Sequence, residues 1–282
     1  MFIKNSDKTA IVWRDLLVSY RDLLSHIHFF ATLFPDRKSG KVVIFAPNSP
    51  EWVYAFYAAW KNHCIAVPID FLSSSDEVAY ILNDCQPEVV FCATETQGVL
   101  NQALEQVHHE VRVFVFEEQR YDLGDYSPEE IDPPDTSETA AIIYTSGTTN
   151  SPKGVMLSYD NMLANVFAVS REIPIFTPDR TVLALLPFHH VFPLLGSLVA
   201  PLYVGAPIAF SPSMVSHDII TTLSQNGVGI IIGVPRLYAA IRAGIMEKIN
   251  KSFAARTMFK LAKLVHSRAF SPCIDSAAGE LL

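Results

Sequence analysis

The sequence predicts an α/β fold in which repeated strand–helix units form mainly parallel sheets with flanking helices. Short apolar runs such as KVVIFAP (41–47) and CIAVPID (64–70) alternate with longer segments whose apolar residues recur at helical spacing. This alternation is typical of parallel strands joined by crossover helices. Half of the 282 residues are apolar, which is enough for one large core or two smaller ones.

The first part of the chain contains three such units. A strand over 8–13 precedes a helix over 19–34, and the strand 41–47 precedes a helix that begins near Ser49 and Pro50. Serine can cap a helix, and proline suits its first turn. After the strand 64–70, the Ser-rich stretch 73–77 leads into a helix over 77–85, and a strand over 87–94 follows.

The middle of the chain changes character before the pattern resumes. Residues 119–139 hold seven acidic residues and three prolines, which predicts a solvated surface connection. Ala140–Ile143 form a predicted buried strand, and 156–170 reads as the start of a helix. The segment YTSGTTNSPKG (144–154) is therefore expected to be a loop between a strand and a helix. A further buried strand is expected within 226–235.

One apolar stretch, 181–210, is long enough to cross a membrane. It contains four prolines and the pair His189 and His190. Each proline removes a backbone donor and breaks regular helix, and in lipid the freed backbone groups would need partners. The sequence therefore favours a buried strand–loop–helix–strand region over a membrane span.

Composition narrows the class of protein. The chain has 21 basic and 29 acidic residues, a net charge of −8, which disfavours general nucleic-acid binding. Its four cysteines form no C-x-x-C pair and show no zinc-ligand spacing, so no metal site is expected. They are interpreted as reduced, mostly buried thiols of a cytoplasmic protein. The N-terminal residues lack the long apolar core of a signal peptide.

The segment 236–268 is strongly basic, with eight basic residues against Glu247 alone. A basic amphipathic stretch can lie on an anionic membrane surface, which would give peripheral contact at the inner membrane face. The other interpretation is a pair of surface helices whose basic faces meet water or an acidic neighbour, and this interpretation is favoured.

The loop 144–154 has the composition of a phosphate cradle. Glycines let the backbone turn sharply and present N–H groups to an anion, hydroxyls add donors, and lysine adds a compact positive charge. The candidate phosphate-binding residues are Thr145, Ser146, Gly147, Thr148, Thr149 and Lys153. Gly154, rather than Ser or Thr, follows Lys153, which disfavours an unrelated P-loop phosphotransferase.

The stretch YTSGTTNSPKGVMLSYDNMLANV closely resembles the signature loop of the adenylate-forming enzymes, which include acyl-CoA synthetases, firefly-type luciferases and peptide-synthetase adenylation domains. The family pattern is roughly [YF]-T-S-G-T-T-G-x-P-K-G. Asn150 stands where the family usually has glycine, and asparagine tolerates positive φ better than other non-glycine residues.

Three other segments carry the same resemblance. LPFHHVF (186–192) is similar to the family's next motif, which makes His190, with His189 beside it, the residue expected in the acyl or carboxylate pocket. GVPRLY (233–238) resembles a following strand and turn. The segment 53–70 resembles an N-terminal helix and strand, although His63 replaces a usual glycine. The resemblance implies a partial AMP-binding domain over 8–270 and an irregular tail over 271–282.

The family reaction comes with the resemblance. A carboxylate attacks the α-phosphate of ATP to give an acyl-adenylate and pyrophosphate, and a thiol, usually coenzyme A, then displaces AMP. The expected small-molecule partners are therefore ATP, CoA and a carboxylic acid, with Mg²⁺ as a cofactor. LPFHHVF and GVPRLY are most similar to the long-chain fatty acid members.

Later family motifs are not found in this sequence. The Y-G-x-T-E segment, the ribose-binding Asp and the small C-terminal domain with its catalytic Lys are missing, and the Mg²⁺ ligand is expected among those later segments. The chain is therefore interpreted as the N-terminal portion of an acyl-CoA synthetase. The alternative is a truncated, non-catalytic fragment that at most binds nucleotide or acyl chain.

Overall fold

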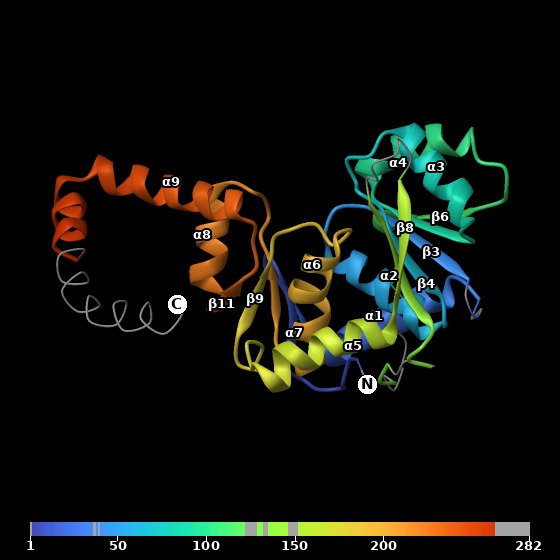
Figure 1. Cartoon of the computed structure of the whole chain (residues 1–282), viewed down its shortest axis with the longest axis horizontal. Coiled ribbons are helices and arrows are strands. Elements are labelled where there is room, and N and C mark those ends of the chain that lie inside the picture. The colour runs from blue at the N-terminus through green and yellow to red at the C-terminus, as the bar shows by residue number, and fades with distance from the viewer. Residues whose placement is uncertain are drawn as a thin grey trace, which may run out of the picture. The chain divides into compact units, whose positions relative to one another are not determined.

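A computed structural model of the chain describes residues 2–35, 38, 40–121, 129–131, 135–145 and 152–262 (Figure 1). It divides into two compact units, Met1–Ile232 and Gly233–Leu282. Four predicted phosphate-binding residues, Ser146, Gly147, Thr148 and Thr149, lie outside the described residues, and so does the predicted tail 271–282.

Among the described residues, the first sheet of unit 1 has six strands in the order β6-β5-β3-β4-β7-β8. The strands are β3 (Lys41–Phe45), β4 (Ile65–Pro68), β5 (Val89–Cys92), β6 (Arg112–Val115), β7 (Thr139–Thr145) and β8 (Lys153–Ser158). Pairs from β6 to β7 are parallel, and β8 runs antiparallel to β7. The predicted α/β fold with mainly parallel strands is confirmed.

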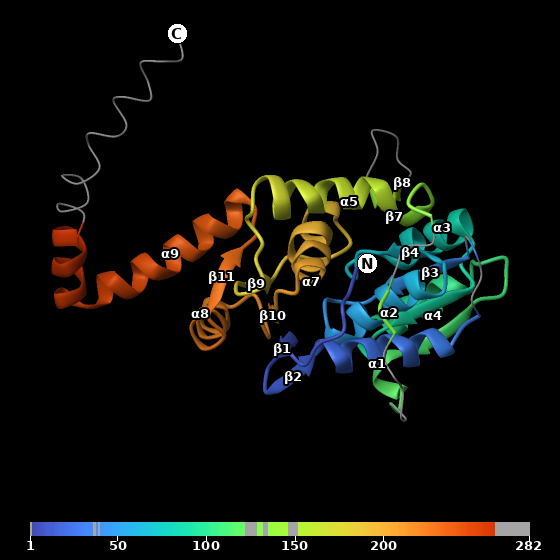
Figure 2. The same ribbon diagram turned by 90° about the horizontal axis from the view of Figure 1, so that it is seen from below.

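Helices cover both faces of this sheet (Figure 2). Alternate residues of a strand point to opposite faces. Val42 and Ile44 belong to the core that includes α1 (Tyr20–Thr32) and α2 (Pro50–Lys61). Val43 and Phe45 belong to a second core with α3 (Ser75–Cys85) and α4 (Thr94–Leu104). The apolar strands of the sequence are thus explained by burial on both faces.

Local capping fixes where these helices begin. The Ser49 hydroxyl accepts a hydrogen bond from the Trp52 N–H, and Pro50 occupies the first turn of α2, as predicted. At α3, Ser74 and Glu77 form a reciprocal capping box. Each cap satisfies backbone donors that the helix itself leaves unpaired.

The buried thiols match their sequence interpretation where the structure describes them. Cys64, Cys85 and Cys92 are buried. Burial raises the pKa of the Cys85 and Cys92 thiols to about 12. Cys273 lies outside the described residues.

In the described part of unit 1, the second sheet has five strands in the order β11-β9-β10-β1-β2. These are β1 (Thr9–Trp13), β2 (Leu16–Ser19), β9 (Thr181–Ala184), β10 (Ile208–Phe210) and β11 (Val228–Ile231). Only the β1–β2 pair of these described strands is antiparallel. The remaining described α-helices of the unit are α5 (Tyr159–Phe167), α6 (Val191–Pro193), α7 (Ala200–Val204) and α8 (Ser216–Gln225).

The apolar stretch 181–210 forms the buried strand–loop–helix–strand region that the sequence predicts. β9 and β10 are fully buried neighbours, and α6, a π-helical segment (Leu194–Val199) and α7 lie between them in the chain. Within the described residues, no helix has both the length and the apolar character needed to cross a bilayer. The strand expected within 226–235 is present as β11, but it is half-buried and lies at the sheet edge.

In unit 2, the helix predicted from residue 236 onward is present. α9 spans Pro235–Lys251, and a further helical stretch covers 253–262. Glu247 pairs with Lys251 one turn later, while Phe253 and Met258 are largely exposed. This mixture of basic and exposed apolar residues is compatible with either interpretation of the basic segment, and contact with a membrane surface stays a prediction.

One expectation from the sequence is wrong. The loop after β7 does not lead into a helix, because residues 153–158 form β8, which returns along β7 as a hairpin. α5 begins only at Tyr159, after a capping box made by Ser158 and Asn161. KGVMLS was misread because its strand conformation depends on pairing with β7 rather than on a strong local pattern.

The hairpin explains the last glycine of the signature segment in structural terms. Gly154 lies directly opposite Tyr144 in the ladder. A Cβ built at Gly154 would come within 2.8 Å of Ile142 Cγ2 and 3.2 Å of Tyr144 Cζ. The Tyr144 ring therefore lies over the glycine, and its hydroxyl donates to the carboxylate of Asp84 on α3.

We predict that Gly154→Ala destabilises the fold by about 1–3 kcal/mol, the usual result of overpacking. Gly98 in α4 is the matched control, because no atom lies within 4 Å of a Cβ built there. Gly98→Ala should instead stabilise by about 0.5–1 kcal/mol through helix propensity. Urea unfolding midpoints of both variants test this pair, and equal midpoints would contradict the tight Tyr144–Gly154 packing.

Candidate functional site

The two ends of the signature loop lie opposite each other. Thr145 closes β7, Lys153 opens β8, and the two are register partners with exposed side chains. The hairpin therefore brings together the first and last of the predicted phosphate-binding residues.

The loop leaves the sheet at the carboxyl end of β7. β4 lies beside β7 and runs parallel to it, so the residues that follow β4 leave from the same edge. In open parallel sheets this edge is where ligands bind. The segment after β4 includes Asp70, which brings a carboxylate to this edge.

Asp70 contacts the histidine motif. The two histidines are adjacent but differ in exposure: His189 is buried and His190 is exposed. Their Nε2 atoms are 3.1 Å apart, and His189 Nε2 lies 3.6 Å from Asp70 Oδ2. The structure thus assembles three polar groups from two segments distant in sequence, and only the histidines were predicted as site residues.

Asn48 holds the histidine motif in place. Its side-chain amide donates to the Leu186 carbonyl over 2.8 Å, and its Oδ1 accepts from the Phe188 N–H over 3.0 Å. The Phe188 ring packs edge-on against Trp52 of α2. Because Asn48 follows β3 and Leu186 follows β9, these bonds link the ends of strands from both sheets.

Burial controls the protonation of His189. Removal from water lowers its pKa to about 4, the neighbouring Asp70 charge partly opposes this shift, and His190 adds slightly to it. The ring is therefore neutral at pH 7. Only one of its two nitrogens then carries a hydrogen.

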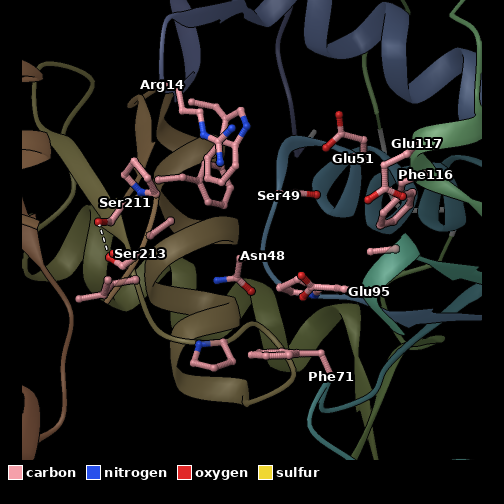
Figure 3. Close-up of a pocket in the computed structure, with 18 of the residues that line it drawn as sticks. Arg14, Asn48, Ser49, Glu51, Phe71, Glu95, Phe116, Glu117, Ser211 and Ser213 are labelled. Atoms are coloured by element: carbon pink, nitrogen blue, oxygen red, sulfur yellow. Dashed lines mark hydrogen bonds between the residues drawn. The ribbon is translucent and has the colours of Figure 1, made fainter. Parts of the chain in front are cut away.

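A cleft of about 780 Å³ lies beside this motif (Figure 3). Its walls come from the carboxyl ends of strands in both sheets, or from the residues that follow them. Examples are Trp13, Asn48, Phe71, Ala93, Phe116 and Phe210. Pro187 and Asn48 connect the cleft to the histidine motif, but His189, His190, Thr145 and Lys153 do not line it.

Two of the carboxylates that line the cleft, Glu51 and Glu117, have structural partners. Glu117 accepts a hydrogen bond from the Thr94 N–H at the start of α4, and Glu51 lies in the first turn of α2. Acidic groups at helix N-termini are stabilised by the helix dipole. In Figure 3, Arg14 lies across the cleft from Glu51 and Glu117, and its guanidinium lies 5.1 Å from the Trp13 ring centre.

The predicted site residues therefore fall into two groups. Thr145 and Lys153 belong to the hairpin, and His189 and His190 belong to the cluster with Asp70. Among the described residues, no hydrogen bond or ion pair joins one group to the other. Within the residues that the structure describes, no group of three or more His, Cys, Asp or Glu residues is arranged to hold a metal ion.

Comparisons with known proteins identify the class. The sequence profile of the AMP-binding enzyme family matches residues 3–271, and the chain belongs to this family. The chain is 28% identical over 264 residues to the peroxisomal long chain acyl-CoA synthetase 6 of Arabidopsis thaliana, covering 83% of this chain and 37% of that protein. It is also 28% identical over 225 residues to the mitochondrial malonate–CoA ligase of Homo sapiens, a match that covers 77% of this chain and 38% of that protein.

Solved structures agree on the fold. ATP-bound MatB from Rhodopseudomonas palustris matches with a TM-score of 0.71 at 23% identity, over 83% of this chain and 48% of that one. The chain thus spans less than two-fifths of the length of the two curated relatives and about half of this solved structure. The fold is that of the N-terminal part of adenylate-forming enzymes.

Sequence reasoning missed Asp70 and Asn48. Asn48 stands just after the predicted strand KVVIFAP, and Asp70 is the last residue of the predicted strand CIAVPID. Polar residues at the carboxyl ends of parallel strands meet at one edge of a sheet. That rule, applied to the predicted strands, would have marked both residues as site candidates.

The low pKa of His189 predicts an acid-sensitive fold. The unfolded chain binds this proton with the ordinary pKa of 6.5, and the folded chain only near 4. Stability contributed by the neutral ring is therefore complete above about 6.5 and is lost as the pH falls towards 4. We expect His189→Gln to reduce the slope of unfolding free energy against pH in this window.

The remaining slope has a second source, because burial also lowers the pKa of His26 to about 4. The matched control is His217→Gln, which changes an exposed histidine on α8. Urea unfolding at several pH values measures the slopes. A slope unchanged by His189→Gln would show that this histidine is not held neutral in the fold.

Proposed function

We propose that this chain supplies the ATP-phosphate loop and the carboxylate pocket of an ATP-dependent acyl-CoA ligase. The observation that carries the proposal is the register pairing of Thr145 with Lys153 at the two ends of the signature loop, in a chain that belongs to the AMP-binding family. The activity joins a carboxylic acid to AMP and then to coenzyme A.

The chemistry fits the residues. Phosphoryl and adenylyl transfer depend on positioning and charge stabilisation more than on covalent help from the protein. Thr145 offers a hydroxyl and Lys153 a compact positive charge, both exposed at the sheet edge. In the proposal they hold the β- and γ-phosphates together with Ser146, Gly147, Thr148 and Thr149, while His190 faces the carboxylate of the substrate.

For the substrate we propose a long-chain fatty acid. Val191 and Phe192 follow His190 directly, and Phe192 is 58% exposed. Malonate, by contrast, would need a cation for its second carboxylate. The sequence neighbours His189, Val191 and Phe192, and Asp70, which lies against His189, carry no positively charged lysine or arginine group, which favours an apolar tail over a second negative charge.

The phosphate part of the proposal predicts that Lys153→Ala weakens ATP binding by roughly tenfold, because a charge-assisted contact to phosphate is lost. Lys4→Ala, which removes another exposed lysine, is the matched control. Isothermal titration of ATP against the three proteins measures the effect. Equal affinity in wild type and Lys153→Ala would remove Lys153 from the site.

Catalysis by the 282-residue chain is a separate question from its binding of ATP. Because the later family motifs are not found in this sequence, we expect the 282-residue chain alone to bind ATP but to give no useful ATP–pyrophosphate exchange with fatty acids. Robust exchange that Lys153→Ala abolishes would show instead that these motifs are dispensable.

The substrate proposal predicts a dependence on chain length. Each buried methylene contributes about 0.8 kcal/mol, so affinity should rise by up to roughly fourfold for each carbon added between hexanoate and decanoate. Malonate should bind more weakly than decanoate. Titration of the three acids measures this order, and malonate binding as tight as that of decanoate would contradict an apolar acyl pocket.

Cellular location stays a prediction. The relatives described above include peroxisomal and mitochondrial proteins, so the family does not prescribe one compartment. A cytoplasmic location remains the proposal from the sequence. For 236–268, solvated surface helices are favoured over peripheral contact at the inner membrane face.

A further inference from the structure

A single ring nitrogen of His189 faces two polar groups. His189 Nε2 lies 3.1 Å from His190 Nε2 and 3.6 Å from Asp70 Oδ2. A neutral histidine carries one proton, on Nδ1 or on Nε2. The position of that proton on His189 therefore decides which nitrogen of His190 can donate a hydrogen bond.

The carboxylate of Asp70 settles the position. An ionised carboxylate only accepts hydrogen bonds, so a lone pair on His189 Nε2 would be repelled, whereas an N–H there is attracted. Burial keeps the His189 ring neutral, because it lowers the pKa well below 7. The single proton of His189 therefore belongs on Nε2, where it also reaches His190.

This assignment fixes the neighbouring ring. If His189 Nε2 donates, then His190 Nε2 accepts, and the proton of a neutral His190 lies on Nδ1. We propose that Asp70 and His189 are positioning residues that hold the exposed His190 as its Nδ1–H tautomer, ready to donate to the substrate carboxylate. The identity of that ligand rests on the proposed function, whereas the tautomer rests on the geometry of Asp70, His189 and His190 and on the neutral state of His189.

Asp70 is itself held in a defined orientation. Its Oδ1 accepts from the Leu72 N–H over 3.0 Å, and its backbone carbonyl accepts from the Ser73 N–H over 2.9 Å. These bonds direct Oδ2 to His189. The two carboxylate oxygens thus have separate tasks, one in the turn and one at the histidine.

This division makes Asp70→Asn a sharp test. An amide NH₂ in place of Oδ1 would set two donors against each other at the Leu72 N–H, so the amide oxygen takes that place and the amide NH₂ faces His189. His189 Nε2 must then accept, its proton moves to Nδ1, and His190 donates through Nε2. The isosteric change therefore inverts the tautomer of His190 and leaves a lone pair on its Nδ1.

The experiment uses the 282-residue chain labelled with ¹⁵N-histidine, at neutral pH. Long-range ¹H–¹⁵N spectra distinguish the two tautomers, and His189→Gln and His190→Gln assign the signals among the nine histidines. We expect Nδ1–H at His190 in the wild type and in the control Asp15→Asn, an exposed site, and Nε2–H in Asp70→Asn. The same His190 tautomer in wild type and Asp70→Asn overturns the proposal.

Decanoate tests the link to the substrate. It should shift the His190 signals of the wild type and bind roughly tenfold more weakly to Asp70→Asn, because a hydrogen bond to a charged group is lost. Matching urea midpoints show that both proteins are equally folded. An inverted tautomer with unchanged decanoate affinity removes His190 from the carboxylate and leaves the tautomer control in place. Absence of decanoate binding in the wild type counts against the proposed function instead.

Discussion

The two hydrogen bonds of the Asn48 side chain are the constraint on which the site depends. They hold the backbone at Leu186 and Phe188 against the end of β3, and so they join the carboxyl edges of two separate sheets. The cleft lies between those edges, and the histidine pair follows immediately in the chain. A side chain that bonds both an N–H and a carbonyl of the same segment fixes its position along the chain as well as its distance, which a purely apolar contact would not do.

The sequence was sufficient where structure is decided locally. Ser49 and Pro50 predict the start of α2. The strands of the first sheet are recognisable in the sequence as apolar runs because both faces of the sheet are covered. It failed where a distant partner decides. The conformation of β8 comes from its pairing with β7, which the local sequence does not reveal. The sequence therefore predicts a loop and a helix start where residues 153–158 form a strand.

The candidate site follows the same division. Lys153 and the histidine pair were found because they belong to segments with a recognisable order of residues. Asp70 belongs to no such motif. Its place at the end of a predicted strand could mark it as a candidate, but its contact with His189 depends on the fold and on the turn that directs one of its oxygens. Nor could adjacency in sequence reveal that His189 is buried while His190 is exposed, since that difference depends on how the motif lies against the rest of the fold.

The buried thiols of the second core, Cys85 on α3 and Cys92 on β5, have a consequence for the chemical behaviour of the chain. Alkylating reagents and disulfides react with the thiolate rather than with the thiol, and at neutral pH almost none of Cys85 or Cys92 is ionised in the folded state. Their reaction therefore requires the helices of the second core to separate from the sheet. The rate at which these two residues are modified therefore measures how often that opening occurs. The native sequence makes this measurement possible without an added label.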